Sequence, residues 1–370
     1  MSQKREVDKV FFSTVLIMAV LGFAVFTSAS MGILAKDSAK FASIMFRQVF
    51  WGLFVGFVAC YLVSRLDYRI LKKYSFYIFL LSVISMILVF VPQLGVSING
   101  AKRWIDIAGM TFQPIEILNT GFIIYLAAWF SFVKDKIEQF RYSLLPLLIL
   151  LGISGILLLL QPDADSFLIL GFVGVVMLVS AGGKFKHIIA VGLIGLLFLV
   201  VLALSRPYIM TRITSFFNPA DNAQSSGYQI QQSLIAVGSG GMFGRGLGQS
   251  IQKFKFLPES ISDSIFAVAG EELGFIGCIF IILLFLFFVF RAFRIAIRSP
   301  DSFGGLLVIG IVILITCRSF MNIASMLGVI PISGVPLAFF SQGGTAMFIT
   351  LIQIGIIISV SRSAKLQQKN

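Results

Sequence analysis

The sequence predicts an all-α polytopic membrane protein with about ten transmembrane helices, and its composition and apolar patterning carry that prediction. The chain has 370 residues, of which 58% are hydrophobic, and its mean hydropathy is +0.98. Only 12% of the residues are charged, about half the fraction that a soluble domain carries. The apolar residues gather in runs of roughly 17–25 residues, each long enough to cross about 30 Å of hydrocarbon as a helix.

Ten apolar runs follow one another along the chain. They cover residues 10–33, 48–64, 74–94, 117–133, 143–160, 166–181, 187–205, 265–290, 303–325 and 343–361. The first run is too long for the core of a signal peptide, so we interpret it as a retained helix even though Ser28-Ala29-Ser30 resembles a cleavage site. Because no segment of soluble-domain length interrupts the runs, we expect a single transmembrane domain over residues 1–370.

The distribution of lysines and arginines predicts the orientation. An even number of spans puts both termini on one side of the membrane, and most of the 29 basic residues fall on that side. Basic residues are enriched on the cytoplasmic side of membrane proteins, so both termini are predicted to be cytoplasmic. The same asymmetry accounts for the net charge of +13 without a nucleic-acid partner.

Cysteine and histidine offer little chemistry in this chain. Cys60, Cys278 and Cys317 each lie inside an apolar run without a paired spacing, which is typical of apolar filler. His187 is the one histidine, so a His-based metal site is not expected.

Three loops are predicted on the outer face, where we expect the function to lie because rigid scaffolds commonly carry functional residues on loops. They cover residues 95–116, 206–264 and 326–342. The second loop, between the seventh and eighth spans, is long, polar and rich in Gly, Ser and Gln.

The start of the eighth span carries the strongest candidate for chemistry. Asp263 lies at the mouth of this helix, where the helix dipole favours an anion. Ala267, Gly270 and Gly274 fall on the same face below it, and Glu271 lies near that face. The small residues either let a neighbouring helix pack closely or leave room for a substrate.

Two further loops carry candidate binding residues. Lys102 and Arg103 are adjacent cations that suit a phosphate group, and Trp104 beside them is equally typical of an anchor at the membrane surface. Lys253 and Lys255 are weaker candidates for the same task.

Charged residues at the edges of other spans leave alternatives open. Glu116 follows Pro114 at the start of the fourth span and either caps that helix or faces a cavity. Arg318 lies inside the ninth span and requires a partner, which is either a structural acid or the substrate. Asp163 and Asp165 have three alternatives: they lie in a solvated turn, they bind a cation, or they pair with Lys102 and Arg103.

Three ordered motifs together resemble the SEDS family of shape, elongation, division and sporulation proteins. The most specific is the stretch from Tyr228 to Gly277, with Gly240-Gly241, Gly244, Gly246-Leu247-Gly248, Leu257-Pro258-Glu259, Asp263 and Glu271-Glu272-Leu273-Gly274. The other two are Arg103-Trp104-Ile105-Asp106 with Phe112-Gln113-Pro114-Ile115-Glu116, and Asn322, Gly328, Pro331, Gly334 and Pro336 with Ser341-Gln342-Gly343-Gly344.

The resemblance implies a peptidoglycan glycosyltransferase that polymerises lipid II into β-1,4 glycan strands at the outer face of the bacterial cytoplasmic membrane. Asp263 stands where the family has its essential aspartate. The Gly240–Gly248 stretch favours a division member, placed at the septum, over an elongation member. A class B penicillin-binding protein is the implied transpeptidase partner, and Mg or Mn is a possible cofactor. The candidate substrate-binding residues are Lys102, Arg103, Trp104, Gln113, Glu116, Glu259, Glu271, Arg318, Ser341, Gly343 and Gly344.

Three positions depart from the pattern of the family. Asn119 replaces a lysine, Asp165 lies where Gly-Thr usually follows the Pro-Asp pair, and Gln342 replaces a tyrosine. Two other functions fit parts of the sequence: a lipid II flippase with Glu116, Glu271 and Arg318 along its path, and a scaffold that only recruits partners. Polymer formed from lipid II in detergent requires catalysis rather than flipping, and a scaffold would not need Asp263.

Overall fold

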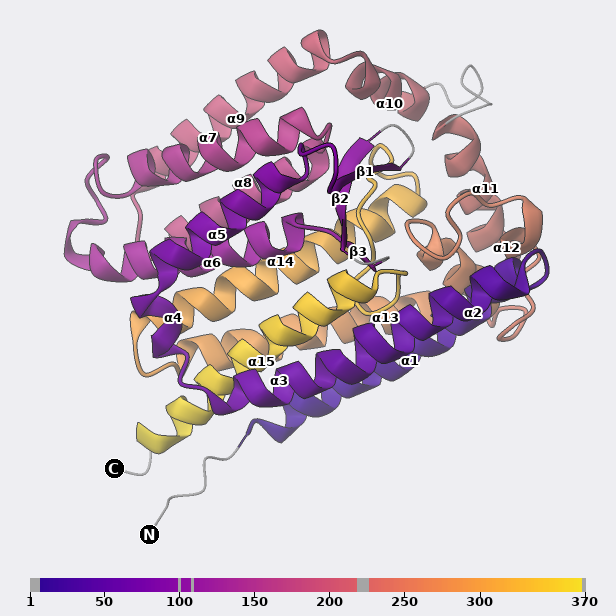
Figure 1. The fold of residues 1–370 in the computed structure, drawn as a ribbon, viewed down its shortest axis with the longest axis horizontal. Helices are drawn as coiled ribbons and strands as arrows, with labels where there is room; N and C mark the ends of the chain where they lie inside the picture. The colour runs from indigo at the N-terminus through magenta and orange to yellow at the C-terminus, as the bar shows by residue number, and fades with distance from the viewer. Residues whose placement is uncertain (1–6, 99–100, 108–109, 218–225, 368–370) are drawn as a thin grey trace.

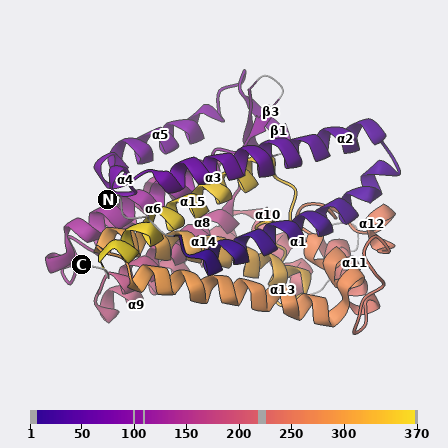
Figure 2. The same cartoon turned by 90° about the horizontal axis from the view of Figure 1, so that it is seen from below.

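Long helices lie side by side in a bundle, shown from two directions in Figures 1 and 2. The structure is a computed structural model and describes residues 7–98, 101–107, 110–217 and 226–367. Helix α1 begins and helix α15 ends at the same end of the bundle, while the sheet and helices α10–α12 lie toward the other end (Figure 1).

The first part of the chain, up to the sheet, is helical with one π-helical segment. Its elements are α1 (Lys9–Leu34), α2 (Ser38–Phe46), the π-helix η1 (Arg47–Val55), α3 (Gly56–Arg65), α4 (Arg69–Lys73) and α5 (Ser75–Leu88). The sheet follows, and the elements behind it are α6 (Ile115–Phe132), the short 3₁₀ helix η2 (Lys134–Lys136), α7 (Leu144–Leu160), α8 (Ala164–Ser180) and α9 (Phe185–Ser205). The last part holds α10 (Pro207–Phe217), α11 (Ser226–Ser239), α12 (Gln252–Lys255), α13 (Ile265–Ile297), α14 (Ser302–Met326) and α15 (Gly344–Gln367).

Each predicted apolar run lies largely on helix in the structure. Within the described ranges, seven helices are long and apolar enough to cross a membrane, and α5, α7 and α8 are shorter apolar helices. The prediction of a polytopic helical membrane protein is therefore confirmed, while the number of spans and the side on which the termini lie stay predictions. Two boundaries differ clearly: the second span begins at Ser38 rather than near residue 48, and α5 ends at Leu88 rather than near residue 94.

Several helices begin at an aspartate because a carboxylate can accept a hydrogen bond from an unpaired backbone N–H of the first turn. Asp8, Asp163 and Asp301 each cap a helix in this way, with oxygen-to-nitrogen distances of 3.0, 3.3 and 2.7 Å. Asp8 also forms an ion pair with Arg291 at 2.8 Å, which ties the start of α1 to α13. These caps fix where α1, α8 and α14 start, and the start of α8 matters for the site below.

The first outer loop is not irregular, and the expectation of an all-α chain is wrong there. Residues Gly95–Ile98, Ala101–Ile107 and Met110–Phe112 form an antiparallel three-stranded sheet in the order β1-β2-β3. The register pairs Val96 with Trp104 and Ile105 with Phe112. Aromatic and β-branched residues favour strands, so this short segment folds as two hairpins between apolar helices.

The second outer loop is also more ordered than expected, since α10, α11 and α12 all lie within residues 206–264. Helix α11 packs against α13 and α14. The glycine-rich segment behind it fills a break in α13 at Gly274, whose φ of +69° is not helical. Backbone N–H groups of residues 245 and 246 donate to the carbonyls of 271 and 272 at 3.0 Å, and those of 275 and 276 donate to the carbonyls of 241 and 242 at 2.8 and 3.2 Å.

This exchange explains the glycines around the break. Inside a membrane, backbone groups released by a broken helix must find partners in the protein. A Cβ atom on Gly244 would lie 2.1 Å from the carbonyl oxygen of Glu272, so only glycine allows this approach. The break divides α13 into a short part that is enclosed by protein, residues 265–273, and a long part with many exposed apolar side chains.

Candidate active site

Asp263 lies in the turn that leads into α13, and its backbone is held from two sides. Nδ2 of Asn322, on α14, donates to the carbonyl oxygens of Asp263 at 2.7 Å and of Val335 at 2.8 Å. The hydroxyl of Ser341 donates to the carbonyl of Ser262 at 2.6 Å. The position of Asp263 is thus set by α14 and by the loop between α14 and α15, both far away in the sequence.

As a residue Asp263 is partly exposed, and among the residues that the structure describes no group donates a hydrogen bond to its carboxylate. A Cβ atom on Gly334 would lie 3.8 Å from its Oδ2 and 3.9 Å from Nη2 of Arg212, so carboxylate and guanidinium face the same point. Enclosure by the protein and then the charge of Glu259 raise the pKa of Asp263 to about 7, against the opposing effect of Arg212. A carboxyl group with a pKa near 7 is suited to act as a general base at neutral pH.

Arg212, on α10, is a site residue that sequence reasoning missed. Its Nη1 lies 2.6 Å from Oδ2 of Asp165, in the first turn of α8. Asp165 therefore pairs with Arg212, and the suggested pairing of the acidic turn with Lys102 and Arg103 is wrong. The reason is local, since Asp163 caps α8 and the second acid of the turn points to α10. The only signal for Arg212 in the sequence was that it is a basic residue in the outer loop 206–264, on the side of the membrane predicted to carry little net charge.

Arg103 approaches the same turn from strand β2. Its Nε donates to the carbonyl of Gln161 at 3.1 Å, and its Nη2 donates to the carbonyl of Pro162. The positive charge still reaches Asp263, whose pKa it lowers as one of the smaller influences. Lys102, one position earlier, is exposed, and Trp104 is partly exposed. Their role in binding a phosphate group stays a prediction.

Glu116 and Arg318 form a buried ion pair between α6 and α14, with 2.7 Å between Oε2 and Nη1. Of the alternatives for Arg318, the structure supports the structural partner. Asn119, one helical turn after Glu116, is buried, and within the described residues neither atom of its amide has a hydrogen-bond partner. Arg318 also lines a cavity of about 20 Å³ with Gln342, which is room for about one water molecule and too little for a sugar.

The Ser341-Gln342-Gly343-Gly344 segment builds the loop beneath Asp263. The hydroxyl of Ser341 accepts from the N–H of Leu337 at 2.8 Å in addition to its bond to Ser262, and the N–H of Gly343 donates to Oε1 of Gln48 at 3.1 Å. These polar groups are thus engaged within the protein. A direct contact of this segment with substrate stays a prediction.

Helix geometry suggested that Glu271 shares a face with Asp263, but the structure places its carboxylate in a different environment. Its carboxylate accepts from the hydroxyl of Ser250 at 2.5 Å and from the backbone N–H of Ile251 at 3.0 Å, and Arg245 lies 3.6 Å away. The break at Gly274 brings the glycine-rich segment onto this part of α13, so the segment takes up the carboxylate.

Glu272, on the opposite face, belongs to a fully buried cluster. Its Oε1 lies 2.7 Å from Nζ of Lys253, and the hydroxyl of Ser28 donates to its carboxylate at 2.6 Å. Nζ of Lys253 also donates to Ser28 and to the carbonyl of Gly248, and the side chain has 0% exposure. Lys253 is therefore not a phosphate ligand, contrary to its earlier interpretation.

Glu259 and Gln113 are the two remaining candidates. Glu259 is exposed, has a φ of +49°, and accepts a hydrogen bond from the hydroxyl of Ser262 at 2.7 Å. Gln113 is partly exposed just before α6. Within the described residues, no group of three or more His, Cys, Asp and Glu side chains could hold a metal ion.

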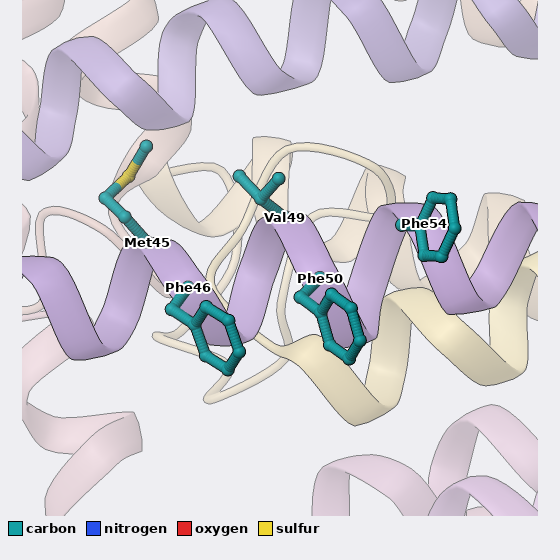
Figure 3. Close-up of a pocket in the computed structure, with 5 residues that line it drawn as sticks. All are labelled: Met45, Phe46, Val49, Phe50 and Phe54. Carbon is teal, nitrogen blue, oxygen red and sulfur yellow. The ribbon is translucent and has the colours of Figure 1, made fainter.

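An open apolar groove runs along η1 and lies apart from this polar site. Figure 3 shows the side chains that line one part of it, which are Met45, Phe46, Val49, Phe50 and Phe54. A second part continues past Leu53 at the end of η1 onto α3, with Phe57, Val58 and Tyr61. Such a surface suits lipid chains or another apolar helix and offers no group for catalysis.

Known proteins are similar to this chain in sequence over most of its length. The family model of the FtsW, RodA and SpoVE cell cycle proteins matches residues 8–366. The chain is 37% identical over 354 residues to a probable peptidoglycan glycosyltransferase FtsW of Geobacter sp. (strain M18), covering 96% of each protein. It is 37% identical over 311 residues to the stage V sporulation protein E of Bacillus subtilis (strain 168), covering 84% of this chain and 85% of that protein.

Solved structures show the same fold. One is a chain from work described as structural coordination of polymerization and crosslinking by a peptidoglycan synthase complex, with a TM-score of 0.78, 25% identity and coverage of 96% of this chain and 98% of that chain. Another is the rod shape determining protein RodA of Thermus thermophilus, with a TM-score of 0.68, 25% identity and coverage of 96% and 97%.

Proposed function

This chain belongs to the FtsW, RodA and SpoVE family of cell cycle proteins, and we propose that, as a peptidoglycan glycosyltransferase, it uses Asp263 as its general base. The observation that carries this proposal is the geometry at Asp263. Its backbone is held by Asn322, while the residue remains partly exposed and its carboxylate faces the same point above Gly334 as the guanidinium of Arg212. A base and a cation side by side are what sugar transfer from a pyrophosphate requires.

The substrate is lipid II, a disaccharide-pentapeptide on undecaprenyl pyrophosphate, which serves as donor and acceptor. The carboxylate of Asp263 takes the proton of the acceptor's 4-hydroxyl as that oxygen attacks the anomeric carbon of the donor. The bond from this carbon to the phosphate oxygen breaks, and the pyrophosphate leaves with the electron pair. Attack from the opposite face inverts the carbon and produces a β-1,4 link.

The raised pKa of Asp263 fits this role. A group with a pKa near 7 is largely ionised at a slightly alkaline pH and yet basic enough to hold the proton it takes. No step is assigned to a metal ion, because Asp163 caps α8 and Asp165 pairs with Arg212. Assays with and without Mg or Mn test whether a divalent cation accompanies the pyrophosphate.

The site belongs on the outer face of the cytoplasmic membrane, since the charge asymmetry of the sequence puts the opposite end of the bundle in the cytoplasm. Similarity to FtsW supports a role in division, at the septum. Similarity to a complex that polymerises and crosslinks supports a crosslinking partner, which we propose to be a class B penicillin-binding protein.

Polymerisation of lipid II by purified protein in detergent tests the proposal. Asp263→Asn removes the base and is expected to lower the rate by roughly 10²–10⁴-fold. Asp135→Asn, an exposed acid in η2, is the matched control and should keep full activity. Because enclosure disfavours the ionised form of Asp263, the Asn variant should not lower the midpoint of thermal unfolding at pH 8. Glycan polymer at the wild-type rate from Asp263→Asn would overturn the assignment.

A further inference from the structure

Arg212 and Asp165 form an ion pair close enough to Asp263 for both charges to act on its carboxylate. The pair joins α10 to the first turn of α8, and the two side chains are 28% and 17% exposed. Oδ2 of Asp165 also accepts from the backbone N–H of Gly334 at 3.4 Å. The second guanidinium nitrogen of Arg212 faces the same point above Gly334 as the carboxylate of Asp263.

Two other cations, which pair with buried acids, are held differently. Arg318 pairs with Glu116 at side-chain exposures of 10% and 3%, and Lys253 pairs with Glu272 at 0% and 0%. Separating such buried partners leaves an uncompensated charge in the interior. The partly exposed pair of Arg212 is screened by solvent and can exchange its partner at much lower cost.

A guanidinium beside a base is also the chemistry that a pyrophosphate leaving group calls for. Its planar fork binds phosphate oxygens with two hydrogen bonds at once, and its charge stabilises the negative charge that develops as the bond to the sugar breaks. A doubly charged phosphate attracts the guanidinium more strongly than a single carboxylate does. Asp165 is thus suited to be the partner that a phosphate replaces.

We propose that Arg212 binds the pyrophosphate group of the prenyl-linked sugar donor, and that Asp165 holds the guanidinium in place until the phosphate displaces it. This inference rests on the proposed function for the identity of the donor. It gives Arg212 and Asp165 a joint role in binding the donor, which the sequence motifs did not indicate. Asp165, a position at which the chain departs from the family pattern, becomes a competitor of the substrate phosphate.

The two partners should therefore act in opposite directions when they are changed. Arg212→Gln removes the phosphate contact and is expected to weaken pyrophosphate binding at least about tenfold. Asp165→Asn keeps an oxygen for the N–H of Gly334 but removes the competing charge, so it should strengthen binding severalfold. A pair that served only to hold α10 against α8 would lose the same contact in either variant, and both changes would act in the same direction.

Titration of inorganic pyrophosphate into the full-length protein in detergent, followed by calorimetry, measures this without requiring turnover. Arg206→Gln, an exposed arginine just before α10, is the matched control for loss of one positive charge and should bind nearly as the wild type does. Arg212→Lys keeps the charge without the planar fork and should fall between the wild type and Arg212→Gln. Thermal unfolding of each variant identifies any that fail to fold.

Opposite shifts in Arg212→Gln and Asp165→Asn would support the proposal, with matching shifts in KM for lipid II. Shifts of the same sign, or wild-type protein that does not bind pyrophosphate, would overturn it. If the wild type binds pyrophosphate with opposite shifts in the variants but forms no glycan, the polymerase proposal fails while the phosphate site stands.

Discussion

The short enclosed part of α13 has an acid near each end, and the protein holds the two acids in different ways. Near its start, Asp263 is fixed through its backbone, and among the described residues nothing donates to its carboxylate. Near its end, Glu272 is fully buried and accepts from Ser28, Lys253 and the N–H of Ser250 at 2.6–3.3 Å. One acid is held in place with its oxygens available, and the other uses its oxygens to hold the structure.

This difference separates chemistry from folding within one stretch of helix. The oxygens of Glu272 are enclosed and engaged by Ser28, Lys253 and the N–H of Ser250, so they are not available to a substrate. A carboxylate that is enclosed but lacks donors has no such partners for its charge, and its pKa rises. The rise at Asp263 to about 7 is therefore the expected result of positioning an acid through its backbone alone.

The largest effect is expected from replacing Lys253, which should lower the stability of the protein. Lys253→Met leaves Glu272 buried without its cation, and breaking such a pair costs about 3–5 kcal/mol of unfolding free energy. The midpoint of thermal unfolding can be followed in detergent by a thiol-reactive dye, since Cys60 and Cys278 are buried in the folded protein. We expect a large decrease for Lys253→Met and no decrease for Asp263→Asn.

The double variant Lys253→Met with Glu272→Gln is the control for this experiment. It removes the charge that Lys253→Met strands in the interior, so it should recover much of the lost stability. If Lys253→Met were as stable as the wild type, the cluster around Glu272 would not hold the fold, and the contrast with Asp263 would disappear.

A smaller effect is expected at Asp263, near the start of α13, and it concerns the pH dependence of the polymerisation rate. The base must be ionised, so with a pKa of about 7 the rate should fall as the pH drops through 7, by up to about tenfold per unit. The charges that act on Asp263 are those of Glu259, Arg212, Asp165 and Arg103. Glu259 raises the pKa, so Glu259→Gln should move the acidic limb of the profile to lower pH.

Single-turnover rates of polymerisation between about pH 5.5 and pH 9 measure this shift. About one measurement per half pH unit defines the acidic limb of the pH–rate profile. Asp135→Asn, remote from Asp263 and exposed, should leave the profile unchanged. A profile of Glu259→Gln that moved to higher pH would mean that another group titrates in this range.

Much of the fold was predictable from the sequence because lipid imposes a simple rule. Residues that cross the hydrocarbon must be apolar and helical, and each of the ten apolar runs lies largely on helix in the structure. The sheet at residues 95–112 was missed because its strands are short and begin directly after the predicted third apolar run. The break at Gly274 was missed because a single glycine within an apolar run does not reveal a kink.

The position of Asp263 was predictable, but its surroundings were not. The motif pointed to the residue, while the pairs that define the site join distant parts of the chain. Asp165 meets Arg212 across 47 positions, and Ser28 meets Glu272 across 244. No local pattern encodes such partners, so Lys253 was still included as a weaker candidate for a phosphate ligand beside Lys102.

The two lysines offer the smallest and final test of the comparison. Lys102 is exposed on β2 near the turn that Arg103 contacts, whereas Lys253 is enclosed with Glu272. Lys102→Ala should change the unfolding free energy by no more than about 0.5 kcal/mol. A screened charge at the rim acts mainly at low ionic strength, so KM for lipid II should rise about two- to threefold in low salt and return toward the wild-type value in about 0.5 M salt. A KM increase that persisted in high salt would instead indicate that Lys102 contacts the bound phosphate directly, as Arg212 is proposed to do.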